Sequence, residues 1–289
     1  MSKMVNRDQR MTVGQVVECF RQMPEKRQLI EHCYLDENLL LAARRFYGSE
    51  EFLSIMEHVV RRGLHASGLV LDLGGGNGVA SLAWNWAGHH VVLMEPDKSD
   101  VVGLGAITPL LKQGEYNIKA CAAIGESLPF SDNTFDIVYA RQILHHVSNL
   151  DAVCAEAYRV LKSKRLFIAT REHVISKPGD LSAFLGNHPV HQYTGGENAY
   201  LLTEYYNALK RAGFKKIEIL GPWESVINYY PMSKSEFVDR CFKSLRKHIG
   251  VRLGQYLAAK RSIQRFYGRY RTVRNQTPGR LYSFLAMRS

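Results

Sequence analysis

The fold of this chain is decided by one stretch, Leu69-Val70-Leu71-Asp72-Leu73-Gly74-Gly75-Gly76-Asn77-Gly78. Its first half is a short apolar run typical of a buried strand, and its second half is a glycine-rich turn. Such a turn lets a ligand approach the backbone closely, because no side chain stands in the way. In an open parallel sheet, ligands bind beyond the carboxyl ends of the strands. The stretch therefore predicts a ligand-binding turn after the first strand of an α/β sheet.

Short apolar runs alternate with longer segments downstream of this turn. Predicted strands lie at residues 69–73, 90–95, 118–123, 135–139, 166–170, 214–220 and 281–288. The longer segments fit helices, and the one at 201–212 ends at Gly213, a common helix terminator. Strand and helix alternation with apolar strands predicts a parallel sheet covered on both faces. We therefore expect an α/β fold, a Rossmann-like, doubly wound, mostly parallel seven-stranded sheet.

Three segments fall outside this alternation. Residues 1–66 show helical spacing of apolar residues and are predicted to form an N-terminal helical cap before the main α/β domain at 67–289. Residues 173–200, before the sixth strand, contain no obvious element and are interpreted as a lid. Residues 221–278, before the seventh strand, are predicted to be a basic helical insertion. Long insertions in a compact domain are often functional.

The positive charge of the chain is concentrated near its C-terminus. The formal net charge is +11, while residues 234–289 carry +12 and the remainder −1. In this segment apolar residues recur at helical spacing between Lys and Arg, which is typical of a basic amphipathic helix. One interpretation is a docked helix with a solvated face. The other is binding of residues 240–274 to an anionic membrane surface; nucleic acid is less favoured, because no RNA-binding module pattern occurs.

Composition narrows the location of the protein. No run approaches the ~18 apolar residues that span a bilayer, and no signal-peptide core follows the polar N-terminus. The five cysteines are scattered and form no CxxC pair, which argues against a disulfide framework or a zinc knuckle. We expect a cytoplasmic protein, either free or peripheral at the inner face of the membrane.

A carboxylate at the end of the second strand narrows the ligand class. Glu95 follows Gly78 by 17 residues and can accept both hydroxyls of a ribose. The dinucleotide pattern GxGxxG is absent, because the turn reads GGGNG. The phosphate-binding sequence GxxxxGK[ST] is absent as well. The pattern therefore indicates a nucleoside-containing cofactor and disfavours dinucleotides and ATP.

Four segments of residues 69–172, about a third of the chain, resemble the class I S-adenosylmethionine-dependent methyltransferases, especially their small-molecule group. They are LVLDLGGGNG (69–78), VVLMEPD (91–97), ESLPFSDNTFDIVYARQILHHV (126–147) and EAYRVLKSKRLFIATRE (156–172). The resemblance implies S-adenosyl-L-methionine as cofactor, bound by Asp72, Gly74, Gly75, Gly76, Gly78, Glu95, Pro96, Gly125, Glu126, Ser127 and Arg141. One departure is Ile124, which stands where relatives commonly carry an acidic residue that contacts the adenine amine.

Ionisable residues follow the fourth and fifth predicted strands, whose ends should meet at one crevice. A hydroxyl acceptor needs a base, for which histidine is the usual choice near neutral pH. The expected catalytic residues are His145, Glu172 and His173. The expected substrate residues are His146, His188, His191, Tyr193, Glu197 and Asn198. The polarity of this set favours a polyhydroxylated acceptor such as a sugar.

A metal is the alternative use of Glu172, His173, His188 and His191. The spacing HPVH is not the helical HxxxH of zinc enzymes, and a proline intervenes, so no metal is expected. The leading hypothesis is therefore methylation, at oxygen, of a small molecule or glycan, free or lipid-linked. Residues 173–200, 225–231 and 277–284 are similar to bacterial methyltransferases of cell-surface polysaccharide pathways. The alternatives are an RNA methyltransferase and a non-catalytic, membrane-associated partner with this fold.

Overall fold

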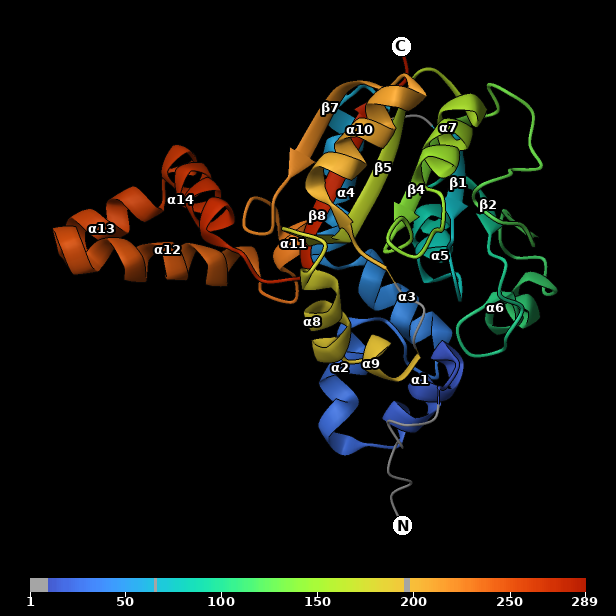
Figure 1. Ribbon diagram of the computed structural model, residues 1–289, viewed down its shortest axis with the longest axis horizontal. Helices are drawn as coiled ribbons and strands as arrows, with labels where there is room; N and C mark the ends of the chain where they lie inside the picture. Colours follow the sequence, from blue (N-terminus) through green and yellow to red (C-terminus); the bar gives the residue numbers. More distant parts are fainter. Residues whose placement is uncertain (1–9, 65–66, 195–197) are drawn as a thin grey trace.

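The structure of the protein is a computed structural model that describes residues 10–64, 67–194 and 198–289. Its centre is one eight-stranded sheet in the order β3-β2-β1-β4-β5-β8-β7, with the short β6 paired to β5 (Figure 1). The strands are β1 (Leu69–Leu73), β2 (His90–Met94), β3 (Ile118–Cys121), β4 (Phe135–Arg141), β5 (Leu161–Ile175), β6 (Tyr200–Leu201), β7 (Lys215–Leu220) and β8 (Arg280–Met287). The α/β prediction is confirmed, but the sheet has eight strands rather than seven.

The strand directions confirm a mostly parallel sheet. Strands β1 to β6 pair in parallel, whereas β8 lies antiparallel between β5 and β7. The extra strand arises because β5 is much longer than the predicted 166–170. Its last residues, Val174 and Ile175, extend beyond β4 and pair with β6. This extension lies inside the segment in which the sequence showed no element.

Helices cover both faces of the sheet and enclose two apolar cores. One core contains residues of α3 (Leu39–Tyr47), α4 (Glu50–Arg61), α5 (Val79–Trp86), α6 (Leu104–Leu111) and α11 (Val226–Tyr229). The other contains residues of α7 (Leu150–Val160) and α10 (Leu202–Ala212). Because α3 and α4 pack into the main core, the C-terminal half of the predicted cap is integral to the sheet domain.

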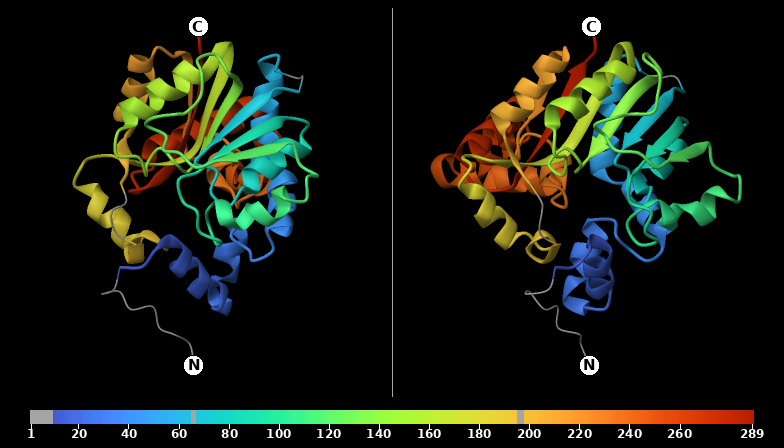
Figure 2. Two further views of the ribbon diagram at one scale, coloured as in Figure 1. Left: turned by 90° about the vertical axis from the view of Figure 1, so that its right-hand side faces the viewer. Right: turned by 45° about the vertical axis from the view of Figure 1, so that its right-hand side comes forward.

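Four helices and a short 3-10 turn lie beyond the end of the sheet that carries the glycine turn (Figure 2). They are α1 (Val13–Arg21), η1 (Pro24–Lys26), α2 (Arg27–His32), α8 (Asp180–Asn187) and α9 (His191–Thr194). The last two belong to the predicted lid, which therefore has helical structure. Phe20 of α1 meets Tyr193 of α9 edge-on, with 6.0 Å between ring centroids. The lid thus packs against the N-terminal helices.

The basic insertion forms a helical arm, residues 234–274, that projects from the side of the sheet (Figure 1). It consists of α12 (Lys234–Ile249), α13 (Val251–Ala258) and α14 (Arg261–Arg274). The arm has a small apolar core of its own, centred on Phe237, Cys241, Ala258 and Tyr267. In the described part of the chain, no helix combines the length and apolarity that crossing a membrane requires.

Candidate active site

The glycine turn connects β1 to α5 and packs tightly against its surroundings. Gly74 and Gly76 adopt φ angles of +66° and +54°, which side-chain-bearing residues rarely adopt. A Cβ atom on Gly74 would lie 2.4 Å from Ile143, in the loop after β4. The backbone N–H of Gly74 also donates to Met94 O of β2 at 2.8 Å. The turn is therefore held between the ends of β2 and β4.

Two carboxylates stand beside this turn. Glu95 accepts hydrogen bonds from the backbone N–H groups of Gly76 at 3.0 Å and Asp97 at 2.9 Å, and burial raises its pKa. Asp72 accepts from the Ser81 hydroxyl at 2.6 Å, and burial raises its pKa to about 7. Both carboxylates line the same cavity. Their positions fit the predicted recognition of the ribose hydroxyls and the amino group of the cofactor.

The cavity has a volume of about 460 Å³ and lies between the glycine turn, the N-terminal helices and the lid. The predicted site residues that line it are Asp72, Gly74, Gly75, Gly76, Glu95, Pro96, Arg141, His145, His146, His173, His188 and His191. Those that are described but do not line it are Gly78, Gly125, Glu126, Ser127, Glu172, Tyr193 and Asn198. The predicted substrate residue Glu197 lies outside the described residues.

Glu172 lies behind the cavity wall and forms a buried pair with His145, which lines the cavity. His145 Nδ1 lies 2.7 Å from Glu172 Oε2, and the two side chains are 1% and 0% exposed. Glu172 also accepts from the backbone N–H groups of Ile143 and His145, both at 3.1 Å. Burial raises the pKa of Glu172 to about 7, while these N–H groups oppose the shift. Glu172 was predicted to be catalytic, but it does not line the cavity and instead holds two residues that do, Ile143 and His145.

Five histidines, His145, His146, His173, His188 and His191, meet in the cavity, and we name them the histidine cluster. They come from the loop after β4, from β5 and from the lid. Ring centroids of His145 and His173 are 4.6 Å apart, and those of His188 and His191 are 3.8 Å apart. Burial lowers the pKa of His173, which favours its neutral form. The sequence predicted catalytic and substrate residues around one crevice, and these five histidines line one cavity.

Arg141 lines the cavity, but its guanidinium is tied to the scaffold. It makes a two-point ion pair with the buried Glu51 of α4, with Nε–Oε1 2.8 Å and Nη2–Oε2 3.2 Å. A third contact joins Arg141 to Gln142 Oε1 at 3.0 Å. Arg141 was predicted to bind the cofactor, whereas the structure gives it a structural partner. The sequence held no signal for this pair, since 90 residues separate its members.

Other predicted residues lie away from the cavity for identifiable reasons. Tyr193 turns toward Phe20 and packs with α1. Glu126 Oε1 accepts from the backbone N–H and the hydroxyl of Ser148, each at 3.2 Å, which holds it against the start of α7. Asn198 Oδ1 accepts from the next backbone N–H, that of Ala199, at 2.9 Å. Gly78 begins α5 with a φ angle of +85° and serves the turn itself.

The N-terminal helices contribute cavity residues that the sequence did not indicate. Cys33, Tyr34 and Phe46 line the wall opposite the glycine turn. Tyr34 stacks on Tyr230, with 5.9 Å between ring centroids, and the guanidinium of Arg141 lies 5.3 Å from the Tyr34 ring. These residues stand in no motif, and only Phe46 lies in a helix whose apolar spacing marks it as buried.

Comparison with known proteins supports the assignment of this site. Residues 71–169 match the family model described as Methyltransferase domain. The chain is 28% identical over 117 residues to the uncharacterized methyltransferase YcgJ of Bacillus subtilis, which covers 38% of this chain and 42% of that protein. It is 31% identical over 111 residues to the ubiquinone/menaquinone biosynthesis C-methyltransferase UbiE of Brucella canis. This match covers 37% of this chain and 41% of that protein. The matched region thus spans less than half of either relative.

A solved structure with a similar fold is phosphoethanolamine N-methyltransferase 2 of Haemonchus contortus in complex with S-adenosyl-L-methionine. Its TM-score is 0.53 at 17% identity, over 93% of this chain and 60% of that chain. The glycine turn, Glu95 and the strand order agree with the family match. Residues 71–169 therefore form a methyltransferase domain, and the chain shares its fold with a protein whose structure contains S-adenosyl-L-methionine. The resemblance of residues 69–172 to this class is confirmed.

Proposed function

We propose that this protein transfers the methyl group of S-adenosyl-L-methionine to a hydroxyl oxygen of a polyhydroxylated small molecule or glycan. The observation that supports this best is the position of the histidine cluster, which shares one cavity with the glycine turn, Asp72 and Glu95. The cofactor would occupy the glycine-turn side. The acceptor would then lie beside the imidazoles, under the lid.

The chemistry needs alignment and a proton acceptor. The acceptor oxygen bonds to the methyl carbon, the carbon–sulfur bond breaks with its electron pair moving to sulfur, and the hydroxyl proton leaves. His173 Nδ1 lies 2.7 Å from the Gly279 carbonyl, which can only accept, so Nδ1 carries the proton and Nε2 keeps a lone pair. His145 is arranged alike when Glu172 is ionised. A general base at this position contributes roughly 10²–10⁴-fold to the rate.

The test is transfer of a labelled methyl group to extracts. Purified protein is incubated with S-adenosyl-L-methionine carrying a ¹³C-methyl group and with glycan, lipid and RNA fractions. We expect an O-methyl resonance in a carbohydrate-containing fraction and a loss of roughly 10²–10⁴-fold in the rate for His173→Gln. Label in RNA, or in no fraction while the cofactor still binds, would contradict the proposal. A carbon-bound methyl is the second candidate, because UbiE is named as a C-methyltransferase.

We also propose that the helical arm docks on an anionic lipid surface, which would suit a lipid-linked acceptor. The arm carries twelve Lys and Arg and only two acidic residues. Large apolar side chains of α13 and α14 are exposed between these cations: Val251, Leu253, Tyr256, Phe266, Tyr270 and Val273. Cationic and apolar side chains on one helical surface favour the interface of an anionic membrane.

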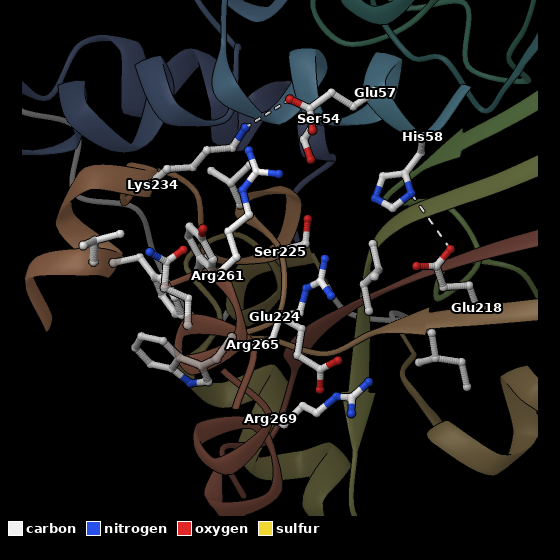
Figure 3. Close-up of a pocket in the computed structure, with 18 of the residues that line it drawn as sticks. Ser54, Glu57, His58, Glu218, Glu224, Ser225, Lys234, Arg261, Arg265 and Arg269 are labelled. Carbon is white, nitrogen blue, oxygen red and sulfur yellow. Dashed lines mark ion pairs between the residues drawn. The ribbon is translucent and has the colours of Figure 1, made fainter. Parts of the chain in front are cut away.

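A groove of about 660 Å³ at the base of the arm adds to this argument (Figure 3). Arg261, Arg265 and Arg269 of α14 line it at spacings of four residues, with Lys234 of α12 nearby. Lys234 pairs with Glu57 at 3.6 Å. Among the described residues, no ion pair joins any of the three arginines to an acidic group. Three such cations along one groove suit the phosphate groups of a lipid surface.

Vesicle sedimentation tests the arm. Each Lys or Arg near an anionic membrane contributes about 1 kcal/mol, so a triple charge reversal at Arg261, Arg265 and Arg269 to Glu should weaken binding by at least ~100-fold. The matched control reverses three exposed lysines elsewhere, Lys112, Lys119 and Lys215. We expect the wild type to bind phosphatidylglycerol vesicles and not phosphatidylcholine vesicles. The arm variant should lose the binding to phosphatidylglycerol vesicles, and the control variant should keep it. Equal loss in both variants, or salt-sensitive binding to RNA instead of vesicles, would contradict the proposal.

A further inference from the structure

The histidine cluster contains two overlapping groups that meet the distance requirement for a metal ion. One is His145, His146 and His191, and the other is His173, His188 and His191. Each histidine offers one ring nitrogen as a ligand, and within each group these nitrogens lie within 4.8 Å of one another. Imidazole groups are the preferred ligands of zinc and its transition-metal neighbours, whereas magnesium prefers oxygen. The chemistry of these groups therefore points to a transition metal.

The hydrogen bonds of the Nδ1 atoms of His145 and His188 show which of the two groups is better suited to bind an ion. His145 faces the Glu172 carboxylate through Nδ1 at 2.7 Å, so Nε2 is the nitrogen through which it would bind an ion. A carboxylate behind a histidine is the usual support of a zinc ligand. His188 Nδ1 instead accepts from the backbone N–H groups of Val190 at 3.3 Å and His191 at 3.2 Å. This arrangement leaves the proton of the neutral ring on Nε2 and makes His188 a poor ligand.

We propose that His145, His146 and His191 bind one divalent transition-metal ion, with Zn²⁺ the best match, at the acceptor end of the cavity. The inference rests on the proposed function, because it names the group that would hold the acceptor hydroxyl. His145 and His191 are buried and His146 is exposed, so the ion would face the cavity from one side. Three protein ligands leave at least one position for an acceptor oxygen, as in catalytic zinc sites.

Zinc binding would need the three imidazoles to move closer together. In a tetrahedral site with zinc–nitrogen bonds of about 2.1 Å, two ligand nitrogens lie ~3.4 Å apart. The ligand atoms of this group lie within 4.8 Å of one another, so the closure is at most ~1.4 Å. His191 lies on α9 of the lid, whereas His145 and His146 follow β4. Binding would therefore draw the lid toward the end of the sheet.

Such an ion would supply one chemical function to the proposed reaction, polarisation of the acceptor hydroxyl as a Lewis acid. Acceptors with two adjacent oxygens, such as a vicinal diol, would bind best, because they can chelate the ion. In this arrangement His145 serves as a ligand, and the Nε2 lone pair of His173 remains to take the hydroxyl proton. The ring centroids of His173 and His145 are 4.6 Å apart.

The site is tested by zinc titration of the full chain. The protein carries no affinity tag of histidines and is first stripped of metal with a chelator. The probe is Zn²⁺ in competition with a chromophoric chelator, and Co²⁺ reports the ligand geometry through its visible absorption bands. We expect one ion per chain and at least ~10–100-fold weaker binding in His145→Ala and His191→Ala, which is the loss seen even for supporting residues. His188→Gln is the matched control within the cluster and should bind like the wild type. Circular dichroism and cofactor calorimetry verify that each variant is folded.

Three results would overturn the inference: no zinc binding, equal affinity in wild type and His145→Ala, or loss in His188→Gln with retention in His145→Ala. The last result would assign the ion to the other group. Calorimetry with S-adenosyl-L-methionine separates this inference from the proposed function. Absent zinc binding with intact cofactor binding and methyl transfer overturns only the metal site. Bound zinc without transfer to any hydroxylated acceptor overturns only the proposed function.

Discussion

His145 Nδ1 lies 2.7 Å from Glu172 Oε2, and this contact joins the loop after β4 to strand β5 inside the protein. The same carboxylate accepts from two backbone N–H groups of the loop, those of Ile143 and His145. Three hydrogen bonds to one buried carboxylate fix the loop and the orientation of the imidazole together. Glu172 therefore positions His145 without touching the cavity.

Replacing Glu172 by Gln tests this positioning role. The amide keeps the size of the side chain but directs N–H groups toward donors, so the loop and the His145 ring lose their alignment. We expect kcat to fall by about 10–100-fold with little change in the Kd for the cofactor. Steady-state kinetics and calorimetry measure the two quantities. The exposed Glu57→Gln serves as control, and a wild-type kcat in Glu172→Gln would refute the role.

Glu95 provides a test of cofactor recognition. Its carboxylate stands beside the glycine turn, where it can accept from both ribose hydroxyls. A hydrogen bond to a charged group contributes about 1.5–3 kcal/mol, so Glu95→Gln should weaken cofactor binding by roughly 10–100-fold. Isothermal calorimetry with S-adenosyl-L-methionine gives the Kd, with the exposed Glu115→Gln as control. Unchanged affinity would mean that the ribose is held by other groups.

The sequence could predict the elements that depend on local pattern. Residues 69–73 are β1 to the residue, because a short apolar run followed by glycines has one compatible local structure. The full length of β5 could not be predicted, since its first residues pair with Phe135 and its last with Tyr200. These pairings are long-range, and local propensity carries no information about them.

The same distinction applies to the site. Histidines at the ends of β4 and β5 could be placed together, because parallel strands end at one edge of the sheet. The ion pair of Glu51 with Arg141 could not, since a carboxylate in the first turn of α4 is also favourable without any partner. Tyr193 was assigned to the substrate on polarity alone, but its ring also packs well against Phe20. An aromatic side chain with a polar tip fits either role.

Asp72 should make cofactor binding depend on pH. Burial and, to a smaller extent, Glu95 raise its pKa, the Ser81 hydroxyl and Arg141 oppose the shift, and the resulting pKa is about 7. Only the ionised carboxylate attracts the amino group of the cofactor, so affinity should decrease as the pH falls below about 7. Calorimetry between pH 6 and 8 measures this, and Asp72→Asn should bind weakly at every pH. If the affinity of Asp72→Asn depended on pH as that of the wild type does, Asp72 would be excluded as the cause of the pH dependence.

Asp72 should affect the free energy of unfolding in the opposite direction to cofactor affinity: this free energy should fall, and not rise, as the pH increases. The folded carboxyl keeps its proton up to pH about 7, whereas in the unfolded chain it loses the proton near its ordinary value of 3.8. The folded state therefore binds more protons between these values, and this contribution to the free energy of unfolding declines as the pH rises through that window. Urea denaturation should show a shallower decline for Asp72→Asn than for the wild type. Identical pH profiles would contradict this expectation.

Glu51 should be important for stability. It is fully buried and balances Arg141 at 2.8 Å, with Arg171 at 4.0 Å. Removing one partner of a buried ion pair costs about 3–5 kcal/mol, because the other charge remains buried. We expect Glu51→Gln to lower the free energy of unfolding by that amount in urea denaturation. The double variant Glu51→Leu with Arg141→Met should recover part of the loss, and a cost below ~1 kcal/mol for Glu51→Gln would contradict the pairing.

Ile124 gives a prediction in the direction of tighter binding. It is 54% exposed, and the resemblance to class I methyltransferases implies an acidic residue at this position that would contact the adenine amine. Ile124→Asp would supply this acceptor, and one additional hydrogen bond contributes about 0.5–1.5 kcal/mol, so the Kd for S-adenosyl-L-methionine should fall roughly 2–10-fold. Ile124→Ala controls for loss of the apolar side chain. A cofactor analogue dimethylated at the adenine amine has no N–H to donate and should show no gain. Equal affinity of Ile124→Asp and the wild type for the natural cofactor would mean that other groups already satisfy the adenine amine.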